Sequence, residues 1–150
     1  MIIYKDGILN KKEKQYISMI ISDTVDVWGD FYITKDRLRL FIRENLHILW
    51  ESLSKGDKIV YGEEGIILIT GFCDNSERKY IKILSNNEEN TNKLLKILNW
   101  NITDISLYAK VKKDSYVLKA LQKNGFKFKG DRGKEILLFR EARTEKQGDN

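Results

Sequence analysis

The 150-residue sequence predicts a single α+β domain with α/β character, in which a mixed, mostly antiparallel central sheet is flanked by helices. Three observations lead to this prediction. Apolar residues repeat at helical spacing in the first third of the chain and in strand-like runs after residue 57. Three successive strands joined by short turns are typical of an antiparallel meander. A later strand–helix–strand succession adds a crossover connection, which makes the sheet mixed.

Two helices are expected before the first long strands. The first begins at Asn10, because Asn10 and Glu13 have the spacing of a capping box. The second follows Thr34 and ends at Gly56, since glycine accepts the left-handed backbone of a helix C-cap. The apolar stripe of this second helix consists of Leu38, Phe41, Ile42, Leu49 and Leu53.

The rest of the chain alternates strands and helices. The meander is predicted over 58–61, 66–72 and 79–84. The following elements are a helix over 90–98, a strand over 104–111, a helix over 114–124 and a hairpin of 126–128 with 135–140. Asp114 is the expected N-cap of the last helix, and Gly125 is its expected stop.

The composition favours a soluble globular protein, with 41% hydrophobic and 33% charged residues. The run Ile66-Ile67-Leu68-Ile69 is too short to span a bilayer, and the first residues lack the order of a secretion signal. The lone Cys73 cannot form an internal disulfide, which favours a reducing compartment, and we expect a cytoplasmic protein. One histidine and one cysteine do not support a metal centre.

The positive charge is concentrated late in the chain. The formal net charge is +5, and the segment 110–134 holds nine Lys/Arg against two Asp, a local net of +7. Such a stretch can attract phosphate, or it can be a solvated lysine face. The alternation Phe126-Lys127-Phe128-Lys129 predicts two buried rings with lysines on the other side of a strand. We therefore expect a solvated face, and nucleic-acid binding through the basic C-terminal third is the weaker alternative.

The order of elements resembles the GNAT superfamily of acyl-CoA-dependent N-acetyltransferases, and so does the segment VLKALQKNGFKF at 117–128. Family members often begin the last helix with Asn and carry Gly-Phe eleven residues later. Here Asp114 stands at the first position, and Gly125-Phe126 matches the second. The chain resembles short members from low-GC bacteria and their phages. The resemblance implies one domain over 1–140 and a flexible polar tail over 141–150.

The resemblance also implies acetyl-CoA as cofactor and no metal. The implied cofactor-binding residues are Ile83, Leu84, Ser85, Asn90, Thr91 and Asp114, with a backbone N–H near Ile83 as oxyanion donor. The loop 84–91 lacks the glycines and the cation of the family's pyrophosphate cradle, where backbone must approach phosphate without a Cβ in the way. Ser85 and Glu88 have capping-box spacing, and Glu88 and Glu89 would repel an anion.

The chemical groups for acetyl transfer are less complete. The family's usual acid is a tyrosine four residues before the Gly-Phe glycine, where this chain has Leu121, and Tyr116 falls on a different helix face. The remaining catalytic candidates are Tyr108, Glu63 and Glu64. His47 and Cys73 are more simply explained as structural residues.

Two classes of function therefore remain open from the sequence. The first is an acyl-CoA-dependent N-acetyltransferase acting on an amine. The second is a catalytically inactive GNAT-fold interaction module that binds a protein partner, encoded by a phage or mobile element. Because members of this fold often dimerise, the resemblance leaves a homodimer open in either case, and no membrane association is expected.

Overall fold

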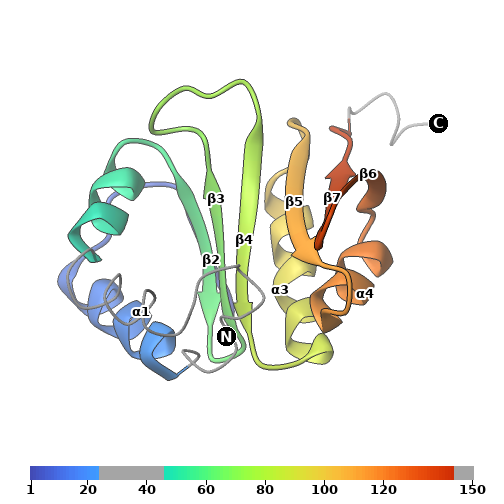
Figure 1. The fold of residues 1–150 in the computed structure, drawn as a ribbon. Coiled ribbons are helices and arrows are strands. Elements are labelled where there is room, and N and C mark those ends of the chain that lie inside the picture. Colours follow the sequence, from blue (N-terminus) through green and yellow to red (C-terminus); the bar gives the residue numbers. More distant parts are fainter. Residues whose placement is uncertain (24–45, 144–150) are drawn as a thin grey trace.

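The computed structural model describes residues 1–23 and 46–143 (Figure 1). It contains a seven-stranded sheet in the order β1-β2-β3-β4-β5-β7-β6. The strands are β1 (Ile3–Lys5), β2 (Lys58–Gly62), β3 (Gly65–Thr70), β4 (Lys79–Ser85), β5 (Leu107–Lys112), β6 (Lys127–Arg132) and β7 (Glu135–Arg140). The helices with full bounds are α1 (Lys11–Asp23), α3 (Glu88–Asn101) and α4 (Tyr116–Lys123), and residues 46–54 are also helical. The predicted α+β class with a mixed, mostly antiparallel sheet is confirmed.

The pair β4–β5 is parallel, whereas the other neighbouring strands of the sheet are antiparallel. Its register joins Lys79 to Leu107, Tyr80 to Tyr108 and Ile81 to Ala109, and then stops. On either side, β4 stays paired with β3 as far as Ser85, and β5 stays paired with β7. The two strands therefore separate at their C-terminal ends. We call the space between residues 82–85 and 110–112 the β4–β5 opening.

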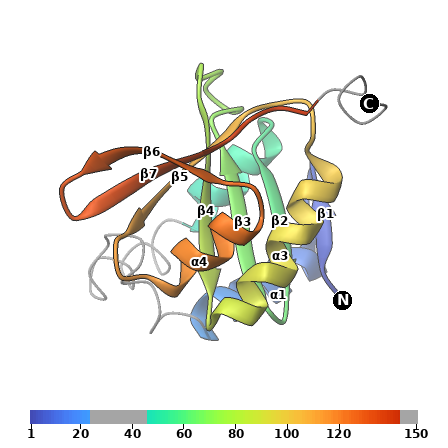
Figure 2. The same cartoon turned by 90° about the vertical axis from the view of Figure 1, so that its right-hand side faces the viewer.

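Helices cover both faces of the sheet, with α1 on one side and α3 and α4 on the other (Figure 1), and Figure 2 shows α3 and α4 in front of the strands. Leu94, Leu95 and Leu98 of α3 are fully buried in the larger core, together with Leu121 of α4 and the inward residues of β3, β4 and β5. A second core lies under α1 and the helical segment 46–54. Burying two apolar sheet faces is what makes the three-layer arrangement stable.

The helix ends show which capping predictions hold. Asn10 N–H donates to Glu13 Oε1 at 2.9 Å, and Glu13 N–H donates to Asn10 Oδ1 at 2.8 Å, which confirms the capping box. Gly125 has a φ of 90°, and Phe126 N–H donates to Leu121 O at 3.0 Å, so the predicted stop of the last helix is confirmed. The predicted start of the second helix at Thr34, with Leu38, Phe41 and Ile42, lies outside the described residues.

Two predictions about local structure were wrong, and one strand was missed. The N-cap of α4 is Ser115 and not Asp114, because burial of Val117 and Leu121 sets the phase of the helix one residue later. Phe128 is 61% exposed and not buried, since it lies on the edge strand β6 beside an irregularity in the register. The strand β1 was not predicted, because its three residues give too short a pattern.

The Gly-Phe junction provides a matched pair of test positions. Phe126 is 1% exposed within the larger core, so Phe126→Ala should lower the free energy of unfolding by about 3–5 kcal/mol. The control is Phe128→Ala, which should change it by no more than about 0.5 kcal/mol. Chemical denaturation of both variants measures the difference. Similar losses in the two variants would contradict the assignment of Phe126 as the core anchor.

Candidate functional site

The candidate site lies at the β4–β5 opening, where β4 ends and both α3 and α4 begin. Ser85 is the last residue of β4, and Tyr116 is the first residue of α4. The Tyr116 hydroxyl donates a hydrogen bond to the Ser85 carbonyl oxygen. Because α4 follows β5, this bond links the end of one diverging strand to the helix that follows the other. The Tyr116 phenol therefore lies at the outer end of the β4–β5 opening.

Two of the predicted cofactor residues, Ser85 and Thr91, are in direct contact. Their hydroxyl groups share a hydrogen bond, and both side chains are almost fully buried. The Thr91 hydroxyl also bonds to Asn87 O at 2.7 Å. These contacts hold the first turn of α3 against the end of β4. The predicted cap of this helix by Ser85 is wrong, because Ser85 remains part of β4, opposite Gly65.

The N-terminus of α3 is capped by Asn87. Its side-chain oxygen accepts a hydrogen bond from the N–H of Asn90 at 2.8 Å, and its backbone is extended. The predicted cofactor residue Asn90 therefore contributes its backbone N–H to the helix's own cap. Helix N-termini bind phosphate through free N–H groups. A side-chain cap removes one of these groups from that role.

The negative charge at this helix end is partly compensated. Glu88 forms an ion pair with Lys123 of α4 at 2.8 Å, and the hydrogen bond from Lys123 lowers the pKa of its carboxyl group. Glu89 is mostly exposed and lies 3.7 Å from the ammonium group of Lys93. The expected repulsion of an anion by Glu88 and Glu89 is therefore weaker than the sequence indicated.

The other predicted cofactor residues have different surroundings. The side chains of Ile83 and Leu84 are buried on opposite faces of the sheet, in the larger and the smaller core. Beyond Ile81, the edge of β4 that faces β5 has no strand partner among the described residues. A backbone N–H near Ile83 on this edge is compatible with the predicted oxyanion donor, which stays a prediction. Asp114 is exposed in the turn before α4.

The catalytic candidates from the sequence do not come together. Tyr108 lies in the paired part of β5, opposite Tyr80. Glu63 and Glu64 form the turn between β2 and β3, next to Gly65, which pairs with Ser85 at the other end of β4. Tyr80 and Ser85 are five positions apart along β4, which corresponds to about 16 Å. Within the described residues, the buried Glu64 Oε1 has no hydrogen-bond partner.

The remaining candidates give no second site. His47 is exposed on the helical segment 46–54. Burial and the neighbouring Asp57 raise the pKa of the Cys73 thiol, which makes it a poorer nucleophile. Residues 1–23 and 46–143 contain no cluster of His, Cys, Asp or Glu able to hold a metal ion. In the same ranges, no helix has the length and apolar content needed to cross a membrane.

Two residues of the site, Tyr116 and Asn87, were not identified from the sequence. Tyr116 was set aside because it lies five positions before Leu121 and so on another helix face, and Leu121 is fully buried. Its position in the chain could have identified Tyr116. Tyr116 follows β5, Ser85 ends β4, and these two strands are parallel. Parallel strands end at the same edge of a sheet, so residues after each strand are brought together.

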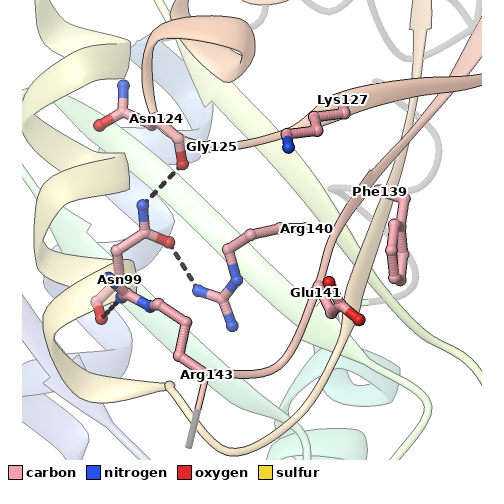
Figure 3. Close-up of a pocket in the computed structure, with 8 residues that line it drawn as sticks. All are labelled: Asn99, Asn124, Gly125, Lys127, Phe139, Arg140, Glu141 and Arg143. Atoms are coloured by element: carbon pink, nitrogen blue, oxygen red, sulfur yellow. Dashed lines mark hydrogen bonds between the residues drawn. The ribbon is translucent and has the colours of Figure 1, made fainter. Parts of the chain in front are cut away.

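A pocket of about 220 Å³ lies at the opposite end of α3 (Figure 3). Its lining residues are Asn99, Asn124, Gly125, Lys127, Phe139, Arg140, Glu141 and Arg143. Asn99 is central to this region. It accepts from Arg140 Nη1 at 2.6 Å through its side chain, donates to Asn124 O at 2.9 Å, and accepts from Arg143 Nη2 at 2.8 Å through its backbone.

This network supports the fold. Arg140 Nη2 also donates to Ile105 O at 3.0 Å, and burial lowers the pKa of the Arg140 guanidinium to about 10. The bonds join the C-terminal ends of α3 and α4 to β7, where cationic donors satisfy carbonyl groups and oppose the negative ends of the helix dipoles. We therefore interpret the pocket as a structural junction.

Comparisons with known proteins identify the fold. No protein-family model matches the chain, and no curated protein sequence matches it significantly. Among solved structures, a GNAT-family acetyltransferase from Streptococcus agalactiae 2603 superposes with a TM-score of 0.62 at 11% identity, covering 95% of this chain and 96% of that one. The PaiA N-acetyltransferase from Thermoplasma acidophilum, in complex with coenzyme A, gives 0.61 at 14% identity, with 94% and 99% covered.

A third structure extends the same result. The N-acetyltransferase PseH from Campylobacter jejuni, in complex with acetyl coenzyme A, gives a TM-score of 0.52 at 17% identity, with 94% of this chain and 99% of that one covered. At such identities a likeness shows the fold alone. The chain has the GNAT fold that the order of its elements and the Gly125-Phe126 junction predicted.

The junction around Asn99 can be tested by substitution. Asn99→Ala leaves Arg140 without one acceptor in a buried position. Because an unsatisfied buried group costs about 1–3 kcal/mol, and a charged one more, the loss of stability should be about 2 kcal/mol or larger. Asn101→Ala is the control, since Asn101 is exposed and bonds within its own helix, and it should change stability by less than about 0.5 kcal/mol. Equal unfolding midpoints for the two variants would refute the structural role.

Proposed function

We propose that the chain is an acyl-CoA-dependent N-acyltransferase that transfers an acetyl group to an amine. The observation that carries the proposal is the divergence of β4 and β5 after Ile81 and Ala109, with Tyr116 at the mouth of the opening. The GNAT fold of the chain supports it, and so does the presence of coenzyme A or acetyl coenzyme A in the PaiA and PseH structures.

The residues present fit an acyl-CoA in part. Among the described residues, the edge of β4 that faces β5 has no strand partner over residues 82–85, and this extended backbone can form strand-like hydrogen bonds to an amide-containing arm. The N-terminus of α3 fits the pyrophosphate less well, because Asn87 already accepts from one of its N–H groups and the loop carries side chains where the family has glycine. We therefore propose weak cofactor binding, held mainly by the β4 edge.

The chain's own groups can serve two steps of the transfer. When bound, the acyl-CoA supplies a thioester whose carbonyl carbon accepts the amine. A backbone N–H of β4 near Ile83 would stabilise the negative charge that develops on the carbonyl oxygen. As the C–N bond forms and the C–S bond breaks, the Tyr116 hydroxyl, beside the end of the same strand, would give a proton to the departing thiolate, and the proton that the amine loses would pass to water. The family's usual tyrosine position holds Leu121, whose buried side chain has no hydroxyl group. Tyr116 is therefore the phenol that we assign to this role.

A second candidate function is an inactive GNAT-fold module that binds a protein partner. The self-capped start of α3 favours it, because Asn87, Ser85 and Thr91 use their polar groups on each other. A chain of this kind from a phage or mobile element would retain the fold without the cofactor. Location in the cytoplasm and formation of a homodimer remain predictions for both candidates.

Calorimetric titration with acetyl-CoA separates the two candidates. The wild-type protein should bind with a dissociation constant in the weak part of the usual range for enzyme substrates, which runs from about 1 μM to about 1 mM. Glu88→Gly/Glu89→Gly should bind more tightly, since it removes the side chains that shield the helix N-terminus. Glu88→Gln/Glu89→Gln is the matched control, because it removes the charges and keeps the side chains.

The outcomes have different meanings. Micromolar binding by the wild type would contradict the argument from the loop. Equal gains in the glycine and glutamine variants would show that charge, and not backbone access, limits binding. If neither the wild type nor the variants bind, the acyltransferase proposal fails and the interaction module becomes the better account.

The assignment of Tyr116 is tested by Tyr116→Phe. Release of free thiol from acetyl-CoA, measured with a panel of small amines, should fall by about a hundredfold or more if the phenol is the general acid. The acetyl-CoA dissociation constant should change far less than the turnover. The control is Tyr16→Phe, an exposed tyrosine on α1 whose ring contacts Tyr61. Turnover equal to that of the control would remove Tyr116 from the mechanism.

A further inference from the structure

Three aromatic rings form a row across the face of the sheet opposite α3 and α4. Tyr80 of β4, Tyr108 of β5 and Phe139 of β7 occupy the same register position on neighbouring strands. Their ring centroids are 5.6 Å apart for Tyr80–Tyr108 and 5.1 Å apart for Tyr108–Phe139. All three side chains are half-buried, whereas the flanking Leu107 and Leu138 are buried on the other face. We call these three residues the aromatic row.

Cations surround the aromatic row. The guanidinium of Arg78 lies 4.7 Å from the Tyr108 ring centre, and the ammonium group of Lys110 lies 5.1 Å from that of Tyr80. Lys129 lies 5.0 Å from the Phe139 ring and 5.9 Å from the Tyr108 ring. Lys127 stands opposite Phe139 in the register of β6. These four basic residues are exposed.

The arrangement differs from an ordinary solvated lysine face. A lysine face needs no aromatic residues beneath it, and half-buried rings leave apolar surface in contact with water. A cation over an exposed ring is worth about 0.5–1 kcal/mol. A nucleic-acid base stacked on such a ring is worth about 1–3 kcal/mol. Bases can therefore displace the cations from the ring faces and leave them available for phosphate.

We propose that the aromatic row and its four cations bind single-stranded nucleic acid. Rings on adjacent strands of an open sheet face, with cations between them, provide stacking for bases and charge for the backbone. Duplexes fit less well, because their bases are already stacked on each other. A single nucleotide would use one ring, whereas three rings on neighbouring strands suit several consecutive nucleotides.

The basic segment 110–134 contributes three of the four cations, Lys110, Lys127 and Lys129, but none of the three rings lies within it. The alternating segment 126–129 contributes Lys127 and Lys129, but Phe128 lies opposite Leu138, toward the α3 and α4 side. The rings come from three separate strands, so no short pattern contains them. The aromatic row lies at the start of β4, and Ser85 lies at its end. The surface is thus distinct from the β4–β5 opening, and the inference does not depend on acyl transfer.

The test is fluorescence anisotropy with a labelled twelve-nucleotide oligouridine and the full chain, over a range of salt concentrations. Tyr108→Leu keeps an apolar side chain but removes the stacking surface, and it should weaken binding by about five- to a hundredfold. Lys110→Ala/Lys129→Ala should also weaken binding, and it should flatten the slope of log affinity against log salt by about 1.4, or 0.7 for each lost phosphate contact.

Matched controls keep the result specific to this surface. Lys96→Ala/Lys119→Ala removes two exposed lysines from α3 and α4 on the other side of the sheet, and it should leave the affinity within about twofold of the wild type. Thermal unfolding of each variant checks that the fold is kept. If Tyr108→Leu unfolds the protein, Tyr80→Leu at the end of the row replaces it, with the same expected loss.

Several results would overturn the proposal. Equal losses in the two double-lysine variants would show attraction by general charge only. Binding of duplex as tight as that of the single strand, or unchanged affinity in a folded ring variant, would exclude stacking on the row. Competition by uridine monophosphate at the same concentration as the oligonucleotide would assign the surface to a small ligand instead.

Discussion

The positions of α3, of the larger core and of the candidate site depend on the short parallel pairing of β4 and β5. Two parallel neighbours require a crossover, which the chain provides as α3, and this helix brings Leu94, Leu95 and Leu98 into the larger core. Because the pairing stops after Ile81 and Ala109, the backbone edges of the two strands are not paired with each other beyond these residues. The site at Ser85 and Tyr116 exists only because the sheet is held together at one end and open at the other.

Sequence patterns predicted the elements that bury an apolar face, and they predicted the site less well. The Asn10 cap, the Gly125 stop and the buried Phe126 follow from local rules that operate within a few residues. Tyr116 was missed because its role depends on a contact 31 residues away along the chain, with Ser85. No periodicity within α4 contains that information.

The same limit explains the misplaced helix caps. Ser85 and Asp114 both have side chains suited to an N-cap, and each stands near the start of a helix. In the structure the caps are Asn87 and Ser115, because Ser85 remains paired in β4 and the phase of α4 is set by burial of Val117 and Leu121. Burial of several apolar side chains outweighs one capping bond, whose removal costs about 1 kcal/mol.

The two ends of β4 present two different chemistries on one strand. At its C-terminal end, helix N–H groups and extended backbone suit a phosphate-bearing thioester, but local side chains compete for the same donors. At its N-terminal end, rings and cations lie on the surface with their apolar faces partly in contact with water. A helix has only four free N–H groups at its start, so each side-chain cap reduces what is left for a ligand. An open sheet face has no such limit, since several rings can each take a base without competing. The described part of the chain thus offers weaker grounds for ligand binding at the site its fold predicts than at the aromatic row, whose rings are only half-buried.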